Sequence, residues 1–186
     1  MSEVSDRYRR VATGFAARLE HCPPDGLEAP SPCEGWKARD VVSHVVHVHR
    51  RVVAGLDGSE ASEPQHGEDL AEAFSVASAA VSAALDHPQR ASQTVSGLFG
   101  AQSFEDLVGR LLCADTLVHT WDLARATGQD DRLDIEAATK ALESLIPMDE
   151  AMRRPGGFGP RADAAALDGA EPDVQAQLIA FTGRHA

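Results

Sequence analysis

Two acids and a histidine share one face of a helix that the sequence predicts near the middle of the chain. Asp115, His119 and Asp122 stand four and three residues apart in the segment LLCADTLVHTWDLARATG. At about 100° per residue, their side chains fall within roughly 60° of one another on a helix. They lie beside the apolar stripe, where burial of a carboxylate is costly. We therefore expect these acids to have a compensating partner.

The spacing of Asp115 and His119 fits two kinds of interaction. A carboxylate and an imidazole four residues apart can form a helix ion pair worth only a few tenths of a kcal/mol. The same two side chains can also direct an oxygen and a nitrogen to one divalent cation. Two ligands are too few for a metal site, so a third must come from another element.

The last acid of this group and the tryptophan before it suit structural roles. Asp122 can pair with Arg125, three residues later, or cap a neighbouring helix, so we interpret it as a structural acid. Trp121 falls at the edge of the apolar stripe and is expected to pack in the core.

Three more histidines lie in an earlier predicted helix, in the segment VVSHVVHVHRR. His47 points well away from the valine stripe, whereas His44 and His49 lie on opposite flanks, each about 60° from its centre. Periodicity does not choose between these two, and a histidine beside an apolar face is more often a core or boundary residue than a ligand. Asp40, one turn before His44, suits the helix N-terminus or a hydrogen bond to a ligand histidine.

Helices must position these residues, because apolar side chains recur at helical spacing along most of the chain. A polar loop is expected at 57–67, an ordered connection across one end of the bundle at 89–102, and another loop at 153–172. Long helices are predicted at 5–20, 37–56, 70–85 and 103–127, and shorter ones at 135–145 and 174–183.

Composition supports an all-α protein with a single domain over residues 1–186. The chain is 43% hydrophobic, 25% charged and only 5% aromatic, which is typical of a globular helical domain. Its formal net charge of -12 would repel nucleic acid and anionic lipid, so we expect neither as a partner. A small-molecule substrate in a pocket remains open.

The sequence also predicts a cytoplasmic protein. The N-terminus MSEVSDRYRR lacks the apolar run of a signal peptide, and no segment approaches the roughly 20 apolar residues that span a bilayer. Three cysteines without Cys-x-x-Cys spacing fit a reducing compartment, and we expect them to be free thiols.

Several segments taken together resemble a known family. They include Trp36, His44, the block from Asp115 through Trp121 and Asp122, and a closing Gly-Arg pair. Over most of its length the chain resembles the actinobacterial metal-binding branch of the DinB-like superfamily, whose members are similar to the N-terminal domain of mycothiol-dependent maleylpyruvate isomerase. The segments that carry the resemblance are SPCEGWKARDVVSHVV, DTLVHTWDLARATGQD, FGPRADA and LIAFTGR.

The resemblance implies a DinB-like four-helix bundle, to which the periodicity adds one or two short C-terminal helices. It implies three metal ligands: His44, eight positions after Trp36, together with Asp115 and His119. The isomerase pattern has Glu where this chain has Asp115, and other DinB-like proteins have His there. Two imidazoles and one carboxylate suit a divalent metal, zinc first and nickel, iron or manganese as alternatives.

Two classes of function follow. The first is an enzyme that uses the metal and a thiol, which the resemblance implies to be mycothiol as cosubstrate, to transfer or isomerise a small electrophilic substrate. The second is a non-catalytic metal- or small-ligand-binding bundle, and a metal-free His-Asp acid/base pair is a weaker third. The sequence identifies no catalytic residue and leaves a homodimer open.

An anionic substrate would need a local cation, because the surface is acidic overall. Arg153, Arg154 and Arg161 surround the PGGFGP loop and are the candidates for substrate binding, with that loop as a lid. Solvated surface charges are the alternative interpretation of the same three residues.

Overall fold

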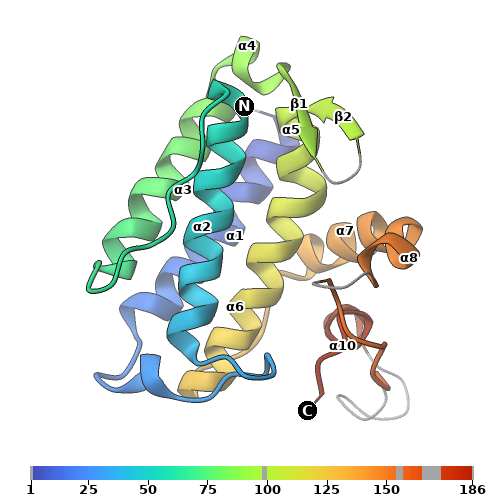
Figure 1. Ribbon diagram of the computed structural model, residues 1–186. Helices are drawn as coiled ribbons and strands as arrows, with labels where there is room; N and C mark the ends of the chain where they lie inside the picture. Colours follow the sequence, from blue (N-terminus) through green and yellow to red (C-terminus); the bar gives the residue numbers. More distant parts are fainter. Residues whose placement is uncertain (1, 98–99, 154–156, 165–172, 186) are drawn as a thin grey trace.

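Four long helices run alongside one another in the computed structural model, which describes residues 2–97, 100–153, 157–164 and 173–185 (Figure 1). Helix α1 contacts α3 and α6, and α2 contacts the same two helices, so the four close into a bundle. This confirms the predicted all-α, DinB-like architecture. The helices are α1 (Glu3–Glu20), α2 (Ala38–Asp57), α3 (Leu70–Asp86) and α6 (Cys113–Thr127).

Side-chain caps define several helix starts. The Asp69 carboxylate accepts from the backbone amides of Ala71 and Glu72 at the start of α3. The Ser103 hydroxyl accepts from the Asp106 amide and so caps the helix that begins at Phe104. Gly128 ends α6 with φ of 68°, a left-handed conformation that glycine adopts without a steric cost.

A β-hairpin occupies most of the predicted connection at 89–102. After the short helix α4 (Pro88–Ala91), the strands β1 (Thr94–Gly97) and β2 (Gly100–Ser103) pair antiparallel, with Thr94 opposite Ser103. Figure 1 shows this hairpin at one end of the bundle, beside α5 (Phe104–Leu107). The prediction of an ordered connection is confirmed, and the hairpin is its form.

The sequence predicted one continuous helix over 103–127, but this helix is interrupted. It consists of α5 (Phe104–Leu107), a π-helical turn η2 (Val108–Leu112) and α6. A π turn holds more residues than an α turn and therefore rotates what precedes it. A regular helix would place Leu107 and Leu111 on the same face as Ala114 and Val118. They are only partly buried, while their neighbours Val108 and Leu112 are buried.

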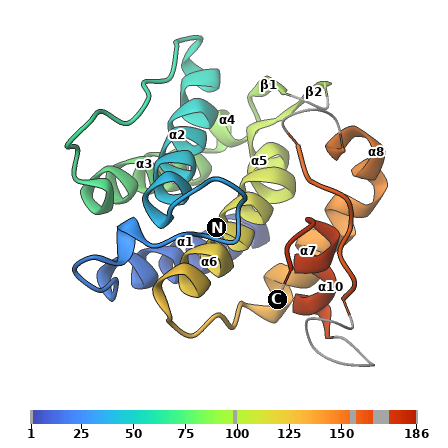
Figure 2. The ribbon, with the colours of Figure 1, turned by 60° about the horizontal axis from the view of Figure 1, so that its bottom comes forward.

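The C-terminal third packs against one side of the bundle (Figure 2). Helix α7 contacts both α6 and α10, so it joins the C-terminal segment to the bundle. The predicted helices at 135–145 and 174–183 are confirmed as α7 (Ile135–Leu145) and α10 (Val174–Phe181), whereas the short segments η1 (Gly26–Glu28), η3 (Ile146–Met148) and α8 (Asp149–Met152) were not expected.

The core has two parts that meet at the fourth long helix. One part holds the valine stripe of α2 together with Tyr8, Phe15 and Phe74. The other holds Trp121, with residues of α7 and α10. In the part of the chain that the structure describes, no helix is long and apolar enough to cross a membrane.

Candidate metal centre

Helices α2 and α6 bring His44, Asp115 and His119 together. Nε2 of His44 lies 3.3 Å from Oδ1 of Asp115, and Nε2 of His119 lies 3.8 Å from the same oxygen. One donor atom from each residue lies within 4.8 Å of the other two. Two nitrogens and one oxygen thus converge from two helices, which is the arrangement of a three-ligand divalent-metal site.

Asp115 supplies the strongest sign that something further belongs at this point. Its side chain is 29% exposed, yet Oδ2 is buried and finds no hydrogen-bond partner among the described residues. Burial alone would raise the pKa of Asp115, but the hydrogen bond from His44 and the charges of the nearby histidines lower it to about 2. An ionised carboxylate with a free oxygen is suited to bind a cation.

The His44 imidazole responds to the same contact. Burial favours its neutral form, but the hydrogen bond and the charge of Asp115 outweigh burial, so the pKa of His44 is raised. A positive charge is therefore favoured between these two helices. A divalent cation would meet that preference with the imidazole in its neutral, metal-binding form.

A buried network fixes the orientation of His119. Its Nδ1–H donates to Oδ2 of Asp122 over 2.8 Å, which leaves Nε2 directed toward Asp115. Asp122 is fully buried and also accepts two hydrogen bonds from Arg184, at 3.1 and 2.8 Å. Burial would raise the pKa of Asp122, but these partners lower it to about 2. The expected pairing of Asp122 with Arg125 is wrong, because Asp122 pairs with Arg184 and Arg125 pairs with Asp131.

Cys33 forms a second close group with His119 and Asp122, and this group does not suit a cation. The Arg184 guanidinium already lies 3.3 Å from the Cys33 sulfur and 2.8 Å from Asp122, so a positive charge is present. Burial, followed by the charge of Asp122, raises the pKa of the Cys33 thiol to about 12. The thiol is therefore protonated, and all three cysteines are free as expected.

Trp36 covers one side of the site. Its ring stacks on His119 with centroids 6.2 Å apart and planes 17° apart, and it lies 5.3 Å from the His44 ring. At 36% exposure, it separates the two imidazoles from solvent on that side.

The other histidines of α2 point elsewhere. His49 is fully buried between Tyr8 and Phe74, and its Nδ1–H donates to the carbonyl of Val45. His47 faces Glu63, 3.3 Å away. Periodicity left His44 and His49 as alternatives, and the structure places His44 with Asp115. Asp40 accepts from the backbone amide of Lys37, so it caps α2. Among the described residues, no hydrogen bond joins Asp40 to His44.

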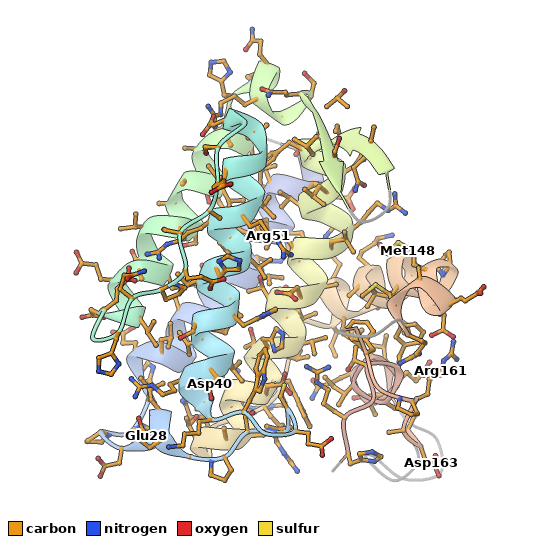
Figure 3. The ribbon with its side chains drawn as sticks, in the orientation of Figure 1. Glu28, Asp40, Arg51, Met148, Arg161 and Asp163 are labelled. Atoms are coloured by element: carbon orange, nitrogen blue, oxygen red, sulfur yellow. The ribbon has the colours of Figure 1, made fainter. Side chains whose placement is uncertain are left out.

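Two of the three predicted substrate-binding arginines are occupied by other contacts. Arg153 and Arg161 both pair with Asp149, and both lie over the ring of Phe181. Figure 3 shows Arg161 in the C-terminal segment, away from the long helices. Arg154 lies outside the described residues, as does part of the PGGFGP loop.

The sequence analysis assigned no role to two arginines near the site. Arg184 belongs to the closing Gly-Arg of the resemblance, and that was its only sequence signal. Arg51 stands seven residues after His44 on the same face of α2, a spacing that could have drawn attention to it.

The protein is thus a helical bundle with a candidate metal centre between two of its long helices, α2 and α6. The sequence model for the mycothiol maleylpyruvate isomerase N-terminal domain matches residues 8–124, a span that contains all three candidate ligands. The chain therefore belongs to this family.

Two relatives match nearly the whole chain. They are uncharacterized proteins from two strains of Mycobacterium tuberculosis, each 32% identical over 178 residues, which cover 95% of this chain and 95% of the relative. No solved structure matches the chain.

Proposed function

We propose that this protein binds one divalent metal ion through His44, Asp115 and His119 and uses it in a thiol-dependent transfer or isomerisation of a small electrophilic substrate. The convergence of three ligand atoms beside the unpartnered Oδ2 of Asp115 supports this function most directly. Family membership supports mycothiol as the thiol cosubstrate. Zinc is the first choice of metal, with nickel, iron or manganese as alternatives.

The donor set fits such a metal. Three protein ligands leave coordination positions open, as catalytic sites do and closed structural sites do not. When bound, a divalent cation would lower the pKa of a thiol or water and polarise a carbonyl group.

The surrounding residues would prepare the site for that chemistry. Asp122 holds His119 in the tautomer that leaves Nε2 free, and Arg184 keeps Asp122 ionised. Asp115 remains a carboxylate at neutral pH, because its pKa is about 2. Trp36 limits the access of water on one side.

Metal titration tests the ligand set. We expect purified, untagged protein to bind one zinc ion per chain, and His44→Ala and His119→Ala to lose about 100-fold or more in affinity. His47→Ala is the matched control, because His47 lies on the same helix but faces Glu63. Full retention of affinity in His44→Ala would exclude this site.

Catalysis is tested separately from binding. Metal-loaded protein should consume mycothiol in the presence of at least one member of a panel of electrophiles, faster than the Asp115→Ala variant. If zinc binds but no electrophile reacts faster than with Asp115→Ala, a non-catalytic metal-binding bundle takes the place of the enzyme.

A further inference from the structure

An apolar cavity of about 620 Å³ lies directly beside the candidate metal centre. It is lined by residues of α2, the α5–α6 run and β1 and by Leu145, Met152 and Phe158, and Asp115 forms part of its wall. This volume is in the range of sites for small organic molecules. Its apolar wall includes Val48, Val52, Leu111, Leu112, Met152 and Phe158.

Arg51 and Asp115 are the ionisable residues among those described that line the cavity. His44, Val48 and Arg51 follow at i, i+4 and i+7 on one face of α2, so Arg51 stands about 10 Å along the helix axis from His44. Figure 3 shows Arg51 between α2 and α6 in this view, well apart from Arg161. The cavity thus has the metal ligands at one end and a guanidinium further along.

Arg51 is an exposed residue that lines the cavity, so its guanidinium can be reached from solvent. The structure gives Arg51 no ion pair or hydrogen bond with any described residue, whereas its neighbour Arg50 pairs with Glu68. A guanidinium binds carboxylate, sulfonate or phosphate oxygens through two parallel hydrogen bonds. In a chain with a formal net charge of -12, an unpaired arginine at an apolar cavity favours an anionic group at this position.

The apolar wall limits the rest of the ligand. Side chains such as Leu112 and Phe158 cannot hydrogen-bond to hydroxyl or amide groups, and Ser59 and Ser96 are the hydroxyl-bearing residues among those described that line the cavity. Most polar groups of a ligand would therefore lose their contacts with water without replacement. A hydrocarbon or aromatic body gains affinity from each apolar group that it buries there.

We propose that this cavity binds an amphipathic organic acid, with its apolar body against α2 and the α5–α6 run and its anionic group at Arg51. The end of the ligand that reaches Asp115 is the reacting end, a part of the proposal that rests on the proposed function. The substrate class is therefore an apolar acid rather than a short, fully polar diacid.

Calorimetric titration with defined acids tests this on the full chain, both zinc-loaded and chelator-treated. Decanoate should bind, and affinity should rise about three- to fourfold for each CH₂ added from hexanoate to decanoate. Succinate, a short diacid, should bind far more weakly than decanoate. Arg51→Gln should weaken the affinity for decanoate about tenfold. Arg50→Gln is the matched control and should leave it unchanged.

A cavity-filling variant checks the apolar wall. Leu111→Trp should abolish decanoate binding while unfolding remains cooperative. Succinate binding as tightly as decanoate, or decanoate affinity unchanged in both Arg51→Gln and Leu111→Trp, would overturn the proposal. Decanoate binding to a protein that takes up no zinc would support the cavity assignment and contradict the proposed function.

Discussion

Asp122 contacts the candidate metal centre through His119. Its Oδ2 accepts from Nδ1 of His119 over 2.8 Å. Because such carboxylates fix the orientation and basicity of a metal-binding imidazole, Asp122→Asn should weaken zinc binding about 10- to 100-fold. Competition with a chromophoric chelator measures this, with Asp131→Asn as a surface control. Unchanged zinc affinity would mean that Asp122 serves the fold alone.

Burial of His49 makes the stability of the fold depend on pH. Burial lowers the pKa of His49 to about 4 from the ordinary 6.5, and the bond to Val45 and the charge of Asp115 do not offset it. Protonation would place a second N–H at Nε2, which has no partner in the described part of the molecule. The unfolded chain therefore binds the proton more readily than the folded protein.

Folding stability therefore decreases as the pH is lowered. The stabilisation is complete above pH 6.5 and is lost as the pH falls toward 4, by up to about 3 kcal/mol. Denaturant unfolding of metal-free protein at several pH values measures it. His49→Phe, which can pack against Tyr8 and Phe74, should flatten the dependence between pH 6.5 and 4. An equally steep dependence in His49→Phe would contradict this.

At the scale of the elements, the π-helical turn before α6 depends on close packing against α1. Gly109 lies in this turn, and a Cβ there would stand 3.1 Å from Val4 and 3.3 Å from the Arg7 guanidinium. Gly14, in the middle of α1, has open space at the same position. The two glycines therefore offer one substitution in two environments.

Alanine at both glycines separates helix propensity from crowding. Gly14→Ala should stabilise the protein by about 0.5–1 kcal/mol, because alanine loses less conformational freedom than glycine on folding. Gly109→Ala should be less favourable than Gly14→Ala by about 1–3 kcal/mol, because Val4 and Arg7 must move. Denaturant midpoints compare the two variants. Equal changes in the denaturant midpoint would show that Val4 and Arg7 move aside without a cost in stability.

At the scale of the whole molecule, Arg184 ties the C-terminal segment to the bundle. Its guanidinium pairs with fully buried Asp122, on α6, and approaches Cys33 in the loop before α2. Removal of one partner leaves a buried charge uncompensated, so Arg184→Met should destabilise the protein by about 3 kcal/mol. The double variant Asp122→Asn/Arg184→Met should recover part of that loss, as a double-mutant cycle measures. Additive losses would contradict a direct coupling.

Local sequence signals are enough to predict the helices and most of their boundaries. Apolar repeats and local caps such as Ser103 and Gly128 act within a few residues, so they can be identified without knowledge of the fold. The same local rules brought Asp115 and His119 to one face. The resemblance supplied His44, which periodicity alone could not separate from His49.

Long-range packing, which local signals do not predict, brings particular groups together across the bundle. The pairing of Asp122 with Arg184 joins residues 62 positions apart, and no local rule selects it over Arg125. The π turn likewise reflects packing of Gly109 against α1, which a regular helical wheel cannot represent. The cavity at Arg51 exists because residues of α2 and the α5–α6 run lie opposite Leu145, Met152 and Phe158, and a space between distant segments is a property of their packing.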